Sequence, residues 1–305
     1  MKCIFIYNPN SGKGRIAKKL AYIQKRLRTQ YEVVDVYATK AKGDLTEKVK
    51  EVADLYDLII FSGGDGTFNE VLQGVGDRKE LPRFGYIPGG TANDVAHSLK
   101  IPRKSVRGAL NVILQGREEK LDCMCINDKD YAIYSVSAGA FTSATYMAPQ
   151  KSKRTFGILA YGFEGIKNNL AFKVFSARAE AEGKTWEGDC VFLLCMNGKC
   201  VAGMKMNPTG SMIDGRLEAA VIDQKHKPKF FDKITALFKV VKLFLFGYHF
   251  KEKKHYLLKG ETIRYEVPED VVWNYDGERG CTGSVEIKVV PKKFPLIIPK
   301  NNKNI

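Results

Sequence analysis

The sequence predicts an α/β protein with two domains, an N-terminal parallel sheet covered by helices and a C-terminal antiparallel β-sandwich. The chain has 305 residues, which is more than a single core usually needs, so two domains are expected. Strand-like and helix-like stretches alternate up to about residue 120, and strand-like stretches dominate afterwards. We therefore expect domains at 1–122 and 123–290, with the apolar tail 291–305 packing back on the first domain.

The first domain is predicted from a regular alternation of elements. Runs rich in β-branched and aromatic residues predict strands, and apolar residues three or four apart predict helices. In chain order these are a strand at 2–7, a helix at 16–28, a strand at 31–37, a helix at 45–55, a strand at 57–61, a helix at 67–75 and a strand at 83–87. Such alternation is typical of a parallel sheet with helices on both faces, whose ligands bind beyond the carboxyl ends of the strands.

The second domain is predicted from many short strands with few helices between them. The strand-like segments are 131–137, 190–196, 217–222, 262–267, 271–275 and 284–290. Two helix-like segments, near 159–168 and at 230–246, interrupt this series. Short strands in such succession favour an antiparallel β-sandwich.

The chain is strongly basic, with 49 Lys and Arg residues against 34 Asp and Glu residues and a net charge of +15. Such an excess favours an anionic partner, which can be nucleic acid, an acidic membrane surface or a phosphorylated ligand. We expect no nucleic acid, because the sequence has no RNA-binding or helix-turn-helix signature.

The sequence predicts no membrane-spanning helix and no disulfide framework. The most apolar segment, 230–246, contains four charged residues, whereas a spanning helix needs ~20 mostly apolar residues. The N-terminus leads directly into a strand and does not resemble a signal peptide. The seven cysteines include no Cys-x-x-Cys pair, so we expect buried, reduced thiols and a cytoplasmic protein.

Three glycine-bearing turns follow strands of the first domain, at Asn8–Gly14, Gly63–Thr67 and Pro88–Asp94. Thr39 follows another strand and is expected on the same rim. Glycines let backbone amides approach a phosphate closely, and a following helix offers its positive N-terminal end. One such turn is commonly only a connection, but three at the same edge of a sheet predict a nucleotide or polyphosphate site.

The common phosphate-loop templates do not fit these turns. The first turn lacks the first glycine of a P-loop, and Lys13 is followed by Gly14 where Ser or Thr would hold magnesium. The second turn lacks the third glycine of the dinucleotide fingerprint and carries Asp65, which would repel a pyrophosphate. A carboxylate inside a phosphate loop is understandable if a metal ion lies between the two.

Gly63–Thr67 has the sequence Gly-Gly-Asp-Gly-Thr and is followed by Asn69 and Glu70. Further motifs occur along nearly the whole chain, at Asn8–Gly12, Gly89–Asp94, Asn197–Lys199, Asn207–Pro208, Ile213–Leu217 and Asp276–Glu278. In content, order and approximate spacing these motifs resemble the diacylglycerol kinases and related lipid kinases, a superfamily shared with sphingosine kinases and NAD kinases. One departure is Gly90, where many members carry a larger residue.

The resemblance implies that the first domain binds ATP together with Mg²⁺. The residues expected at the ATP site are Asn8, Pro9, Asn10, Ser11, Gly12, Thr39, Gly63, Gly64, Asp65, Gly66, Thr67, Glu70, Gly90 and Thr91.

Three carboxylates carry the implied chemistry. Glu278 would be the general base that takes the proton from the lipid hydroxyl, although by spacing alone the segment 276–278 is more simply a surface turn. Asp65 would hold the catalytic magnesium through water. Asp122 would extend the same network at the domain junction, and its alternative role is that of a hinge residue.

In some bacterial members of the family a second, structural Mg²⁺ is bound before a strand of the β domain. Carried over by resemblance, its ligands are the side chain of Asp214 and the backbone oxygens of Ser211 and Arg216. The alternative is that this segment forms only a β-turn.

The basic residues gather in two segments. Residues 1–31 contain eight basic side chains and no acidic one, and residues 225–259 contain ten basic side chains against Asp232 and Glu252. The second segment contains an apolar and aromatic stripe at helical spacing, which consists of Phe230, Ile234, Leu237, Val241, Phe244 and Tyr248. A cationic helix with such a stripe can lie in a membrane interface, or the stripe can pack on the β domain.

Lys151, Lys153 and Arg154 form a second candidate membrane contact.

The sequence therefore predicts an ATP-dependent lipid kinase that phosphorylates a membrane lipid, with diacylglycerol and phosphatidic acid as the expected substrate and product. The alternatives are a kinase of another lipid, a kinase of a water-soluble substrate such as NAD, or a non-enzymatic nucleotide-binding or anion-binding protein. We expect a cytoplasmic protein at the inner face of an anionic membrane. No motif identifies the lipid or the oligomeric state, and a homodimer stays open.

Overall fold

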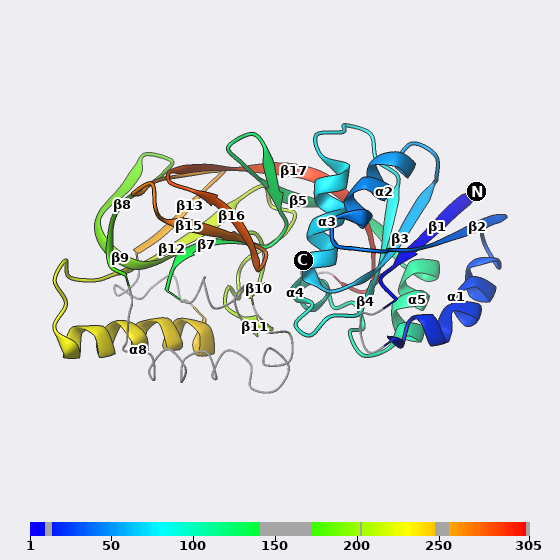
Figure 1. Ribbon diagram of the computed structural model, residues 1–305, viewed down its shortest axis with the longest axis horizontal. Coiled ribbons are helices and arrows are strands. Elements are labelled where there is room, and N and C mark those ends of the chain that lie inside the picture. Colours follow the sequence, from blue (N-terminus) through cyan, green and yellow to red (C-terminus); the bar gives the residue numbers. More distant parts are fainter. Residues whose placement is uncertain (10–13, 141–172, 202, 248–255, 303–305) are drawn as a thin grey trace. The chain divides into compact units, whose positions relative to one another are not determined.

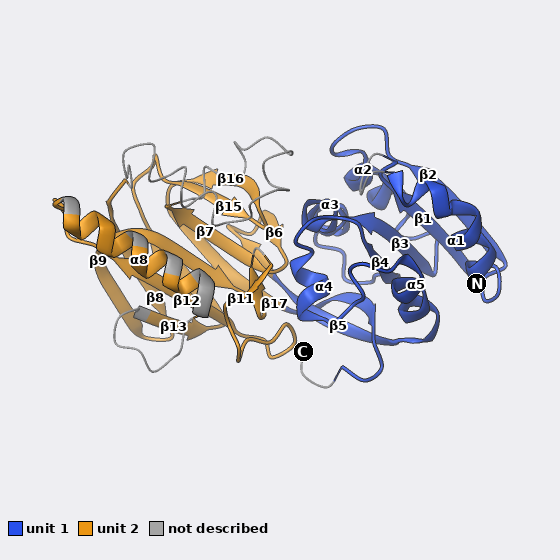
Figure 2. Ribbon diagram, turned by 90° about the horizontal axis from the view of Figure 1, so that it is seen from below, with its two compact units in different colours: residues 1–123, 291–305 blue, residues 124–290 orange. Residues whose placement is uncertain are grey.

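The computed structural model describes residues 1–9, 14–140, 173–201, 203–247 and 256–302. The chain forms two compact units (Figure 2). Unit 1 consists of Met1–Cys123 and Pro291–Ile305, and unit 2 consists of Met124–Val290. The chain passes from one unit to the other within two strands, β5 (Arg117–Ile126) and β17 (Val285–Ile298).

Unit 1 is built on a parallel sheet. Its strands are β1 (Lys2–Tyr7), β2 (Val33–Ala38), β3 (Leu58–Gly63) and β4 (Arg83–Pro88). Their order across the sheet is β4-β3-β1-β2. In the register, Tyr7 lies beside Ala38 and Ser62. Gly63 lies beside Pro88. The carboxyl ends of all four strands therefore meet at one edge of the sheet.

Helices cover both faces of this sheet (Figure 1). They are the 3-10 helix η2 (Ala17–Lys19) and the α-helices α1 (Leu20–Leu27), α2 (Asp44–Val52), α3 (Asp65–Val75), α4 (Asp94–Ser98) and α5 (Val106–Gln115). Helices α2 and α3 touch, since a Cβ on Gly74 would stand 2.7 Å from the backbone oxygen of Thr46. Helices α1 and α5 are joined by a hydrogen bond from Arg26 to Asn111. This arrangement confirms the predicted fold class of the first domain.

The C-terminal part of the chain contributes to the core of unit 1. Leu296 of β17 pairs with Phe84 of β4 in parallel. The ring of Phe294 stacks on Phe84 with centroids 4.3 Å apart and also contacts Phe68 of α3. Burial of aromatic rings of this size stabilises a core strongly, so the tail is part of the sheet of unit 1.

Unit 2 is an antiparallel β structure (Figure 1). Strand β9 pairs with β7, β8 and β12, strand β15 pairs with β7 and β16, and strand β14 pairs with β8 and β17. This pattern confirms the predicted antiparallel sandwich. Its strands are β6 (Asp130–Ala132), β7 (Ser135–Gly139), β8 (Phe175–Ala181), β9 (Lys184–Met196), β10 (Cys200–Val201), β11 (Met204–Lys205), β12 (Leu217–Asp223), β13 (Tyr256–Gly260), β14 (Thr262–Glu266), β15 (Val272–Tyr275) and β16 (Glu278–Thr282).

The helix predicted at 230–246 is present as α8 (Phe230–Phe246). Among its described side chains, Ala236, Val240 and Leu243 are buried and belong to a cluster with apolar residues of β9 and β12. Helix α8 therefore packs at least one apolar side on the β structure. Of that stripe, only Ile234 has a described side chain, and it is partly exposed. Tyr248 and the helix predicted near 159–168 lie outside the described residues.

Within the part of the chain that is described, no helix combines the length and the apolar character that crossing a membrane requires.

Candidate active site

The glycine turns after β3 and β4 are joined at their backbones. The N–H of Gly89 donates to the carbonyl oxygen of Gly63 at 2.7 Å. The hydroxyl of Tyr86 donates to the same oxygen at 3.0 Å. Because β3 and β4 are neighbours in the sheet, these bonds continue the pairing of the strands into the turns that follow them.

A side chain would be crowded at three glycine positions of these turns. A Cβ on Gly63 would collide with the side chain of Thr67. A Cβ on Gly64 would stand 3.1 Å from the Cα of Gly90. A Cβ on Gly90 would stand 2.5 Å from the Cα of Gly64 and 2.9 Å from Oδ1 of Asn93. The backbones of the two turns thus pass so close together that no side chain fits between them. This explains Gly90, which departs from the family pattern.

Asp65 is the first residue of α3, and Gly64 precedes the helix in an extended conformation. Oδ1 of Asp65 accepts the backbone N–H of Asp94 at 2.6 Å, which links the second turn to the start of α4. The first N–H groups of a helix have no partner inside it and give this end a partial positive charge. Asp65 therefore lies where two glycine turns and the N-terminus of a helix meet.

Asn93 and Tyr86 hold the third turn, although the sequence analysis did not single them out. Asn93 is buried and has a positive φ of 52°. Its side chain accepts the N–H of Gly90 at 2.9 Å and donates to the oxygen of Gly90. Burial, and then the negative charges of Asp65 and Asp94, raise the pKa of Tyr86 well above 10, so its hydroxyl remains a donor. Asn93 and Asp94 end a motif that was noted, whereas Tyr86 carried no signal in the sequence.

The remaining residues expected at the ATP site take several positions. Asn8 and Pro9 follow β1 directly, and the backbone N–H of Thr39 donates to the oxygen of Tyr7 at 2.9 Å. Thr91 is exposed, and Glu70 is a partly exposed residue in α3. Asn10, Ser11 and Gly12 lie outside the described residues.

Asp122 is fully buried in β5. Its Oδ1 accepts the backbone N–H of Lys292 at 2.8 Å, and Lys292 has a positive φ of 53°. Asp122 thus anchors the returning tail within unit 1. Its role in the catalytic network of Asp65 stays a prediction.

The segment 276–278 of unit 2 is a tight hairpin turn. Asp276 and Gly277 both have positive φ angles, of 51° and 92°, and Tyr275 pairs with Glu278 across the turn. Two residues with positive φ define a turn whose twist matches that of the flanking strands, and Asp-Gly is a preferred pair for it. Glu278 is therefore the first residue of β16, at a fixed position, and its side chain is partly exposed.

Asp276 is buried, whereas Glu278 is partly exposed. The carboxylate of Asp276 accepts the backbone N–H groups of Ile133, Tyr134 and Ser135 at 2.7–3.0 Å. The side chain of Asn197 donates to the oxygen of Ile133 at 2.8 Å. The motifs at Asn197–Lys199 and Asp276–Glu278 thus both bind the backbone of residues 133–135. This segment separates β6 from β7, so the strand predicted at 131–137 is divided into two.

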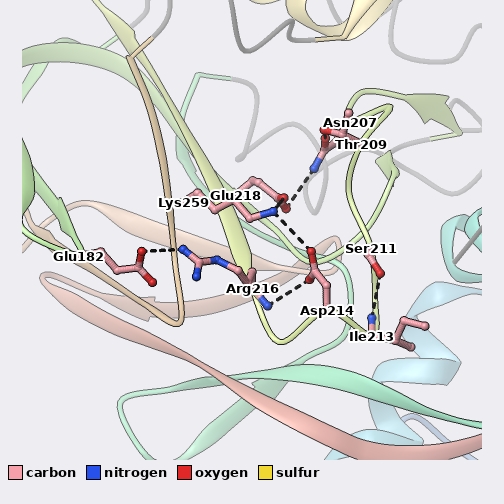
Figure 3. A network of polar contacts seen from close by, with 9 residues as sticks. All are labelled: Glu182, Asn207, Thr209, Ser211, Ile213, Asp214, Arg216, Glu218 and Lys259. Atoms are coloured by element: carbon pink, nitrogen blue, oxygen red, sulfur yellow. Dashed lines mark hydrogen bonds and ion pairs between the residues drawn. The ribbon is translucent and has the colours of Figure 1, made fainter.

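The predicted structural metal site lies in a polar network of unit 2 (Figure 3). Oδ1 of Asp214 accepts the N–H of Arg216 at 3.1 Å, and the hydroxyl of Ser211 accepts the N–H of Ile213. The ammonium of Lys259 lies 3.4 Å from Oδ2 of Asp214. The same ammonium lies 2.8 Å from Oε1 of Glu218, which the sequence analysis did not consider.

The pKa values of Glu218 and Lys259 depend on burial and on the contacts between the two side chains. Burial raises the pKa of Glu218, and its bonds with Lys259 and Asn207 act in the opposite direction. Burial alone would lower the pKa of Lys259, but the bonds and charges of Glu218 and Asp214 outweigh it and raise the pKa. Lys259 therefore carries its charge at neutral pH.

Neither zinc-type clusters nor disulfides occur in the described part of the chain. No group of three or more His, Cys, Asp or Glu side chains there could enclose a metal ion. The seven cysteines are unpaired with one another, and all but Cys281 are buried. Burial raises the pKa of the Cys3 thiol to about 12, which makes it unreactive near neutral pH.

Both halves of the chain match models of known protein families. Residues 2–126 match the diacylglycerol kinase catalytic domain. Residues 134–298 match the YegS C-terminal NAD kinase beta sandwich-like domain. A diacylglycerol kinase of Bacillus subtilis (strain 168) is 30% identical over 297 residues, covering 97% of this chain and 95% of that protein.

Solved structures share the fold. A crystal structure of a diacylglycerol kinase from Bacillus anthracis str. Sterne superimposes with a TM-score of 0.77 at 22% identity, over 100% of this chain and 98% of that one. An NAD kinase from Archaeoglobus fulgidus, crystallised in complex with ATP, has a TM-score of 0.50 at 14% identity, over 100% of this chain and 95% of that one.

Proposed function

Because the chain belongs to the diacylglycerol kinase family and is a kinase, we propose that it transfers a phosphoryl group from ATP to the hydroxyl of diacylglycerol, giving phosphatidic acid. The observation that carries this proposal is the junction of two glycine turns in unit 1, where Asp65 begins α3 and accepts the N–H of Asp94. This junction offers the first backbone N–H groups of α3 for phosphate and a carboxylate for a metal ion.

The turns of unit 1 would hold the phosphates of ATP. The close approach of Gly64 to Gly90 brings the backbones of two turns together beside the N-terminal end of α3, whose first N–H groups have no partner inside the helix. Backbone N–H groups and a helix N-terminus together favour an anionic ligand. The ATP bound to the Archaeoglobus fulgidus NAD kinase supports ATP as the donor.

The carboxylate of Asp65 suits Mg²⁺, which does not need a site built entirely from protein ligands. Mg²⁺ is commonly held by one or two carboxylates together with phosphate oxygens and water. Asp65 supplies such a carboxylate next to the proposed phosphate site. When bound, the ion would neutralise negative charge on the phosphate oxygens. Asp122, whose Oδ1 accepts the backbone N–H of Lys292, would extend this network at the domain junction.

Glu278 would be the general base. A lipid hydroxyl is too weak an acid to ionise unaided, and a positioned carboxylate can accept its proton as the oxygen attacks phosphorus. Of the two carboxylates in the hairpin, Asp276 is occupied by three backbone N–H groups, whereas Glu278 stands at the partly exposed start of β16. Phosphoryl transfer depends mainly on positioning and charge, which the rigid hairpin supports.

Helix α8 would contact an anionic membrane surface that contains the lipid. Phe231 and Phe238 are 79% and 68% exposed, which is unusual for rings of this size. They stand seven residues apart and therefore share one side of the helix with Thr235 and Lys242, which are also exposed. Exposed aromatic rings beside lysines suit a membrane interface.

Lys239 of α8 supports membrane binding less than Lys242 does. The ammonium of Lys239 pairs with the carboxylate of Asp223 at 2.9 Å, so this lysine is already partly neutralised. Lys151, Lys153 and Arg154 lie outside the described residues.

Phosphate transfer to competing acceptors tests the proposed function. Purified protein is incubated with γ-labelled ATP, Mg²⁺ and either diacylglycerol in mixed micelles with anionic lipid, or NAD in solution. We expect label in phosphatidic acid. The NAD kinase fold makes NAD the specific second candidate, and label in NADP with none in lipid would replace the lipid-kinase proposal by that alternative.

A further inference from the structure

The turn before β12 carries the residues that the family resemblance assigns to a structural Mg²⁺, yet a cation from β13 already lies against it. The ammonium of Lys259 lies 3.4 Å from Oδ2 of Asp214 and 2.8 Å from Oε1 of Glu218 (Figure 3). The ammonium thus bridges the carboxylate expected to bind the metal and a second, buried carboxylate.

All four oxygens of these two carboxylates accept a hydrogen bond from the chain. Oδ1 of Asp214 accepts the N–H of Arg216 at 3.1 Å, and Oδ2 accepts Lys259. Oε1 of Glu218 accepts Lys259, and Oε2 accepts the side-chain amide of Asn207 at 3.1 Å. A divalent ion at Asp214 would share these oxygens with the donors and would stand close to the ammonium, whose positive charge repels it. The charges of the residues present therefore disfavour a divalent ion at this turn.

The position of Lys259 is determined by strand pairing. Glu218 of β12 and Lys259 of β13 are direct partners in the antiparallel register. Opposite charges at such positions attract across the strand pair. Glu218 is only 1% exposed, and a buried carboxylate left without a cation is costly. Lys259 supplies the cation that this carboxylate needs.

A second ion pair holds the same turn from the other side. The guanidinium of Arg216 pairs with Glu182, 2.6 Å away, in the hairpin between β8 and β9. The turn is thus tied to β13 through Lys259 and to the β8–β9 hairpin through Arg216, without a metal ion.

We propose that the Lys259 ammonium takes the place of the structural divalent cation at this turn, so that unit 2 of this chain folds independently of Mg²⁺ at Asp214. The proposal concerns stability and does not depend on which substrate the enzyme phosphorylates.

Thermal unfolding of the full chain without nucleotide tests the proposal in two steps. First, the wild-type protein and Asp214→Asn are melted in EDTA and in millimolar Mg²⁺ at equal ionic strength. We expect the same Mg²⁺ response, close to zero, in both proteins. Stabilisation of the wild type that Asp214→Asn abolishes would overturn the proposal, and this step needs no variant of Lys259.

In the second step Lys259→Met removes the ammonium and keeps most of the side-chain volume. We expect Tm in EDTA to fall by several degrees and to rise again on addition of Mg²⁺ or Ca²⁺, while Lys259→Arg stays near the wild type. A Lys259→Met protein as stable as the wild type in EDTA would overturn the proposal.

Lys288→Met is the matched control. Lys288 is 39% exposed, against 37% for Lys259, and it also pairs with two carboxylates, Asp128 and Glu286. Asp128 is 72% exposed, so this pair is solvated and we expect no divalent-ion response. An equal response of the two Met variants would indicate general charge effects and would overturn the proposal.

Discussion

At the scale of single residues, the hairpin at 276–278 assigns its two carboxylates different tasks. Asp276 is buried and accepts three backbone N–H groups, so it fixes the segment 133–135 against the turn. Glu278 leads out of the same turn at the start of β16 and is partly exposed. A general base has to reach a proton on the substrate, and of these two carboxylates only that of Glu278 is accessible to solvent, which is why we propose it for this role.

Glu278→Gln should lower kcat by about 10²–10⁴-fold, because glutamine keeps the volume but cannot take a proton. The affinity for ATP should stay near normal, since the proposed phosphate site is in unit 1. Kinetics and calorimetry on one preparation measure both quantities. Glu266→Gln, an exposed position at the end of β14, is the control and should be fully active. If ATP affinity fell together with kcat, Glu278 would be a nucleotide-site or structural residue.

Gly90→Ala should weaken ATP binding by about tenfold or more, which corresponds to ~1.4 kcal/mol. The new Cβ would stand 2.5 Å from the Cα of Gly64, so the two phosphate-binding turns have to move apart. Calorimetric titration with ATP measures the effect.

Gly74→Ala is the control for this steric effect. Its Cβ would collide with α2 at 2.7 Å from the oxygen of Thr46, far along α3 from the turns. Overpacking of this kind costs ~1–3 kcal/mol of stability. We expect a lower Tm with unchanged ATP affinity, and an ATP affinity equally reduced in both variants would show that the turns have no special role.

At the scale of elements, the local sequence pattern was sufficient to predict a helix or strand where a single apolar run spans the whole segment. The bounds of α8 follow from a long apolar run, and β1 follows from an apolar run at the start of the chain. β9 begins earlier than predicted, at Lys184, because its first half is polar and paired with β8, so it has no apolar signal. The division between β6 and β7 could not be predicted, because it depends on Asp276, more than a hundred residues away.

The face of α8 shows the limit of reasoning from periodicity. An apolar stripe at helical spacing was visible, but the helix is apolar on more than one side. Packing against β9 and β12 selected Ala236, Val240 and Leu243 for burial and left Phe231 and Phe238 exposed. Only the three-dimensional contacts show which of these side chains are buried.

The double variant Phe231→Ser/Phe238→Ser should bind anionic vesicles more weakly. Full burial of a Phe side chain contributes ~1.5–3 kcal/mol, so partial insertion of two rings makes the loss measurable by vesicle sedimentation. Leu55→Ser removes another exposed apolar side chain, which is 60% exposed and lies in unit 1, and should leave binding unchanged. Unchanged binding of the double variant would mean that this side of α8 is not the contact.

At the scale of the whole molecule, the motifs predicted the family and the two kinds of domain, and the structure adds why the motifs are placed as they are. Gly63, Gly64 and Gly90 permit two backbones to approach, Asp65 ties them together, and Asn197 and Asp276 hold one segment of unit 2. The sequence could not show that Lys259 reaches the proposed metal ligands, because this contact depends on the register of β12 and β13.

The central claim is that Asp65 and the joined glycine turns form the phosphoryl-transfer site of a lipid kinase. Asp65→Asn keeps the volume and retains an oxygen for the N–H of Asp94, so the fold should be preserved. It removes the charge that would attract a metal ion. Asp77→Asn, an exposed position just beyond the end of α3, is the control for a lost carboxylate and should remain active.

The most direct measurement is the initial rate of phosphate transfer from labelled ATP to diacylglycerol by the wild type and by Asp65→Asn, over a series of Mg²⁺ concentrations. We expect transfer by the wild type and a loss of turnover in Asp65→Asn that saturating Mg²⁺ does not restore, with an unchanged Tm. Near-normal turnover of Asp65→Asn at saturating Mg²⁺ would contradict it.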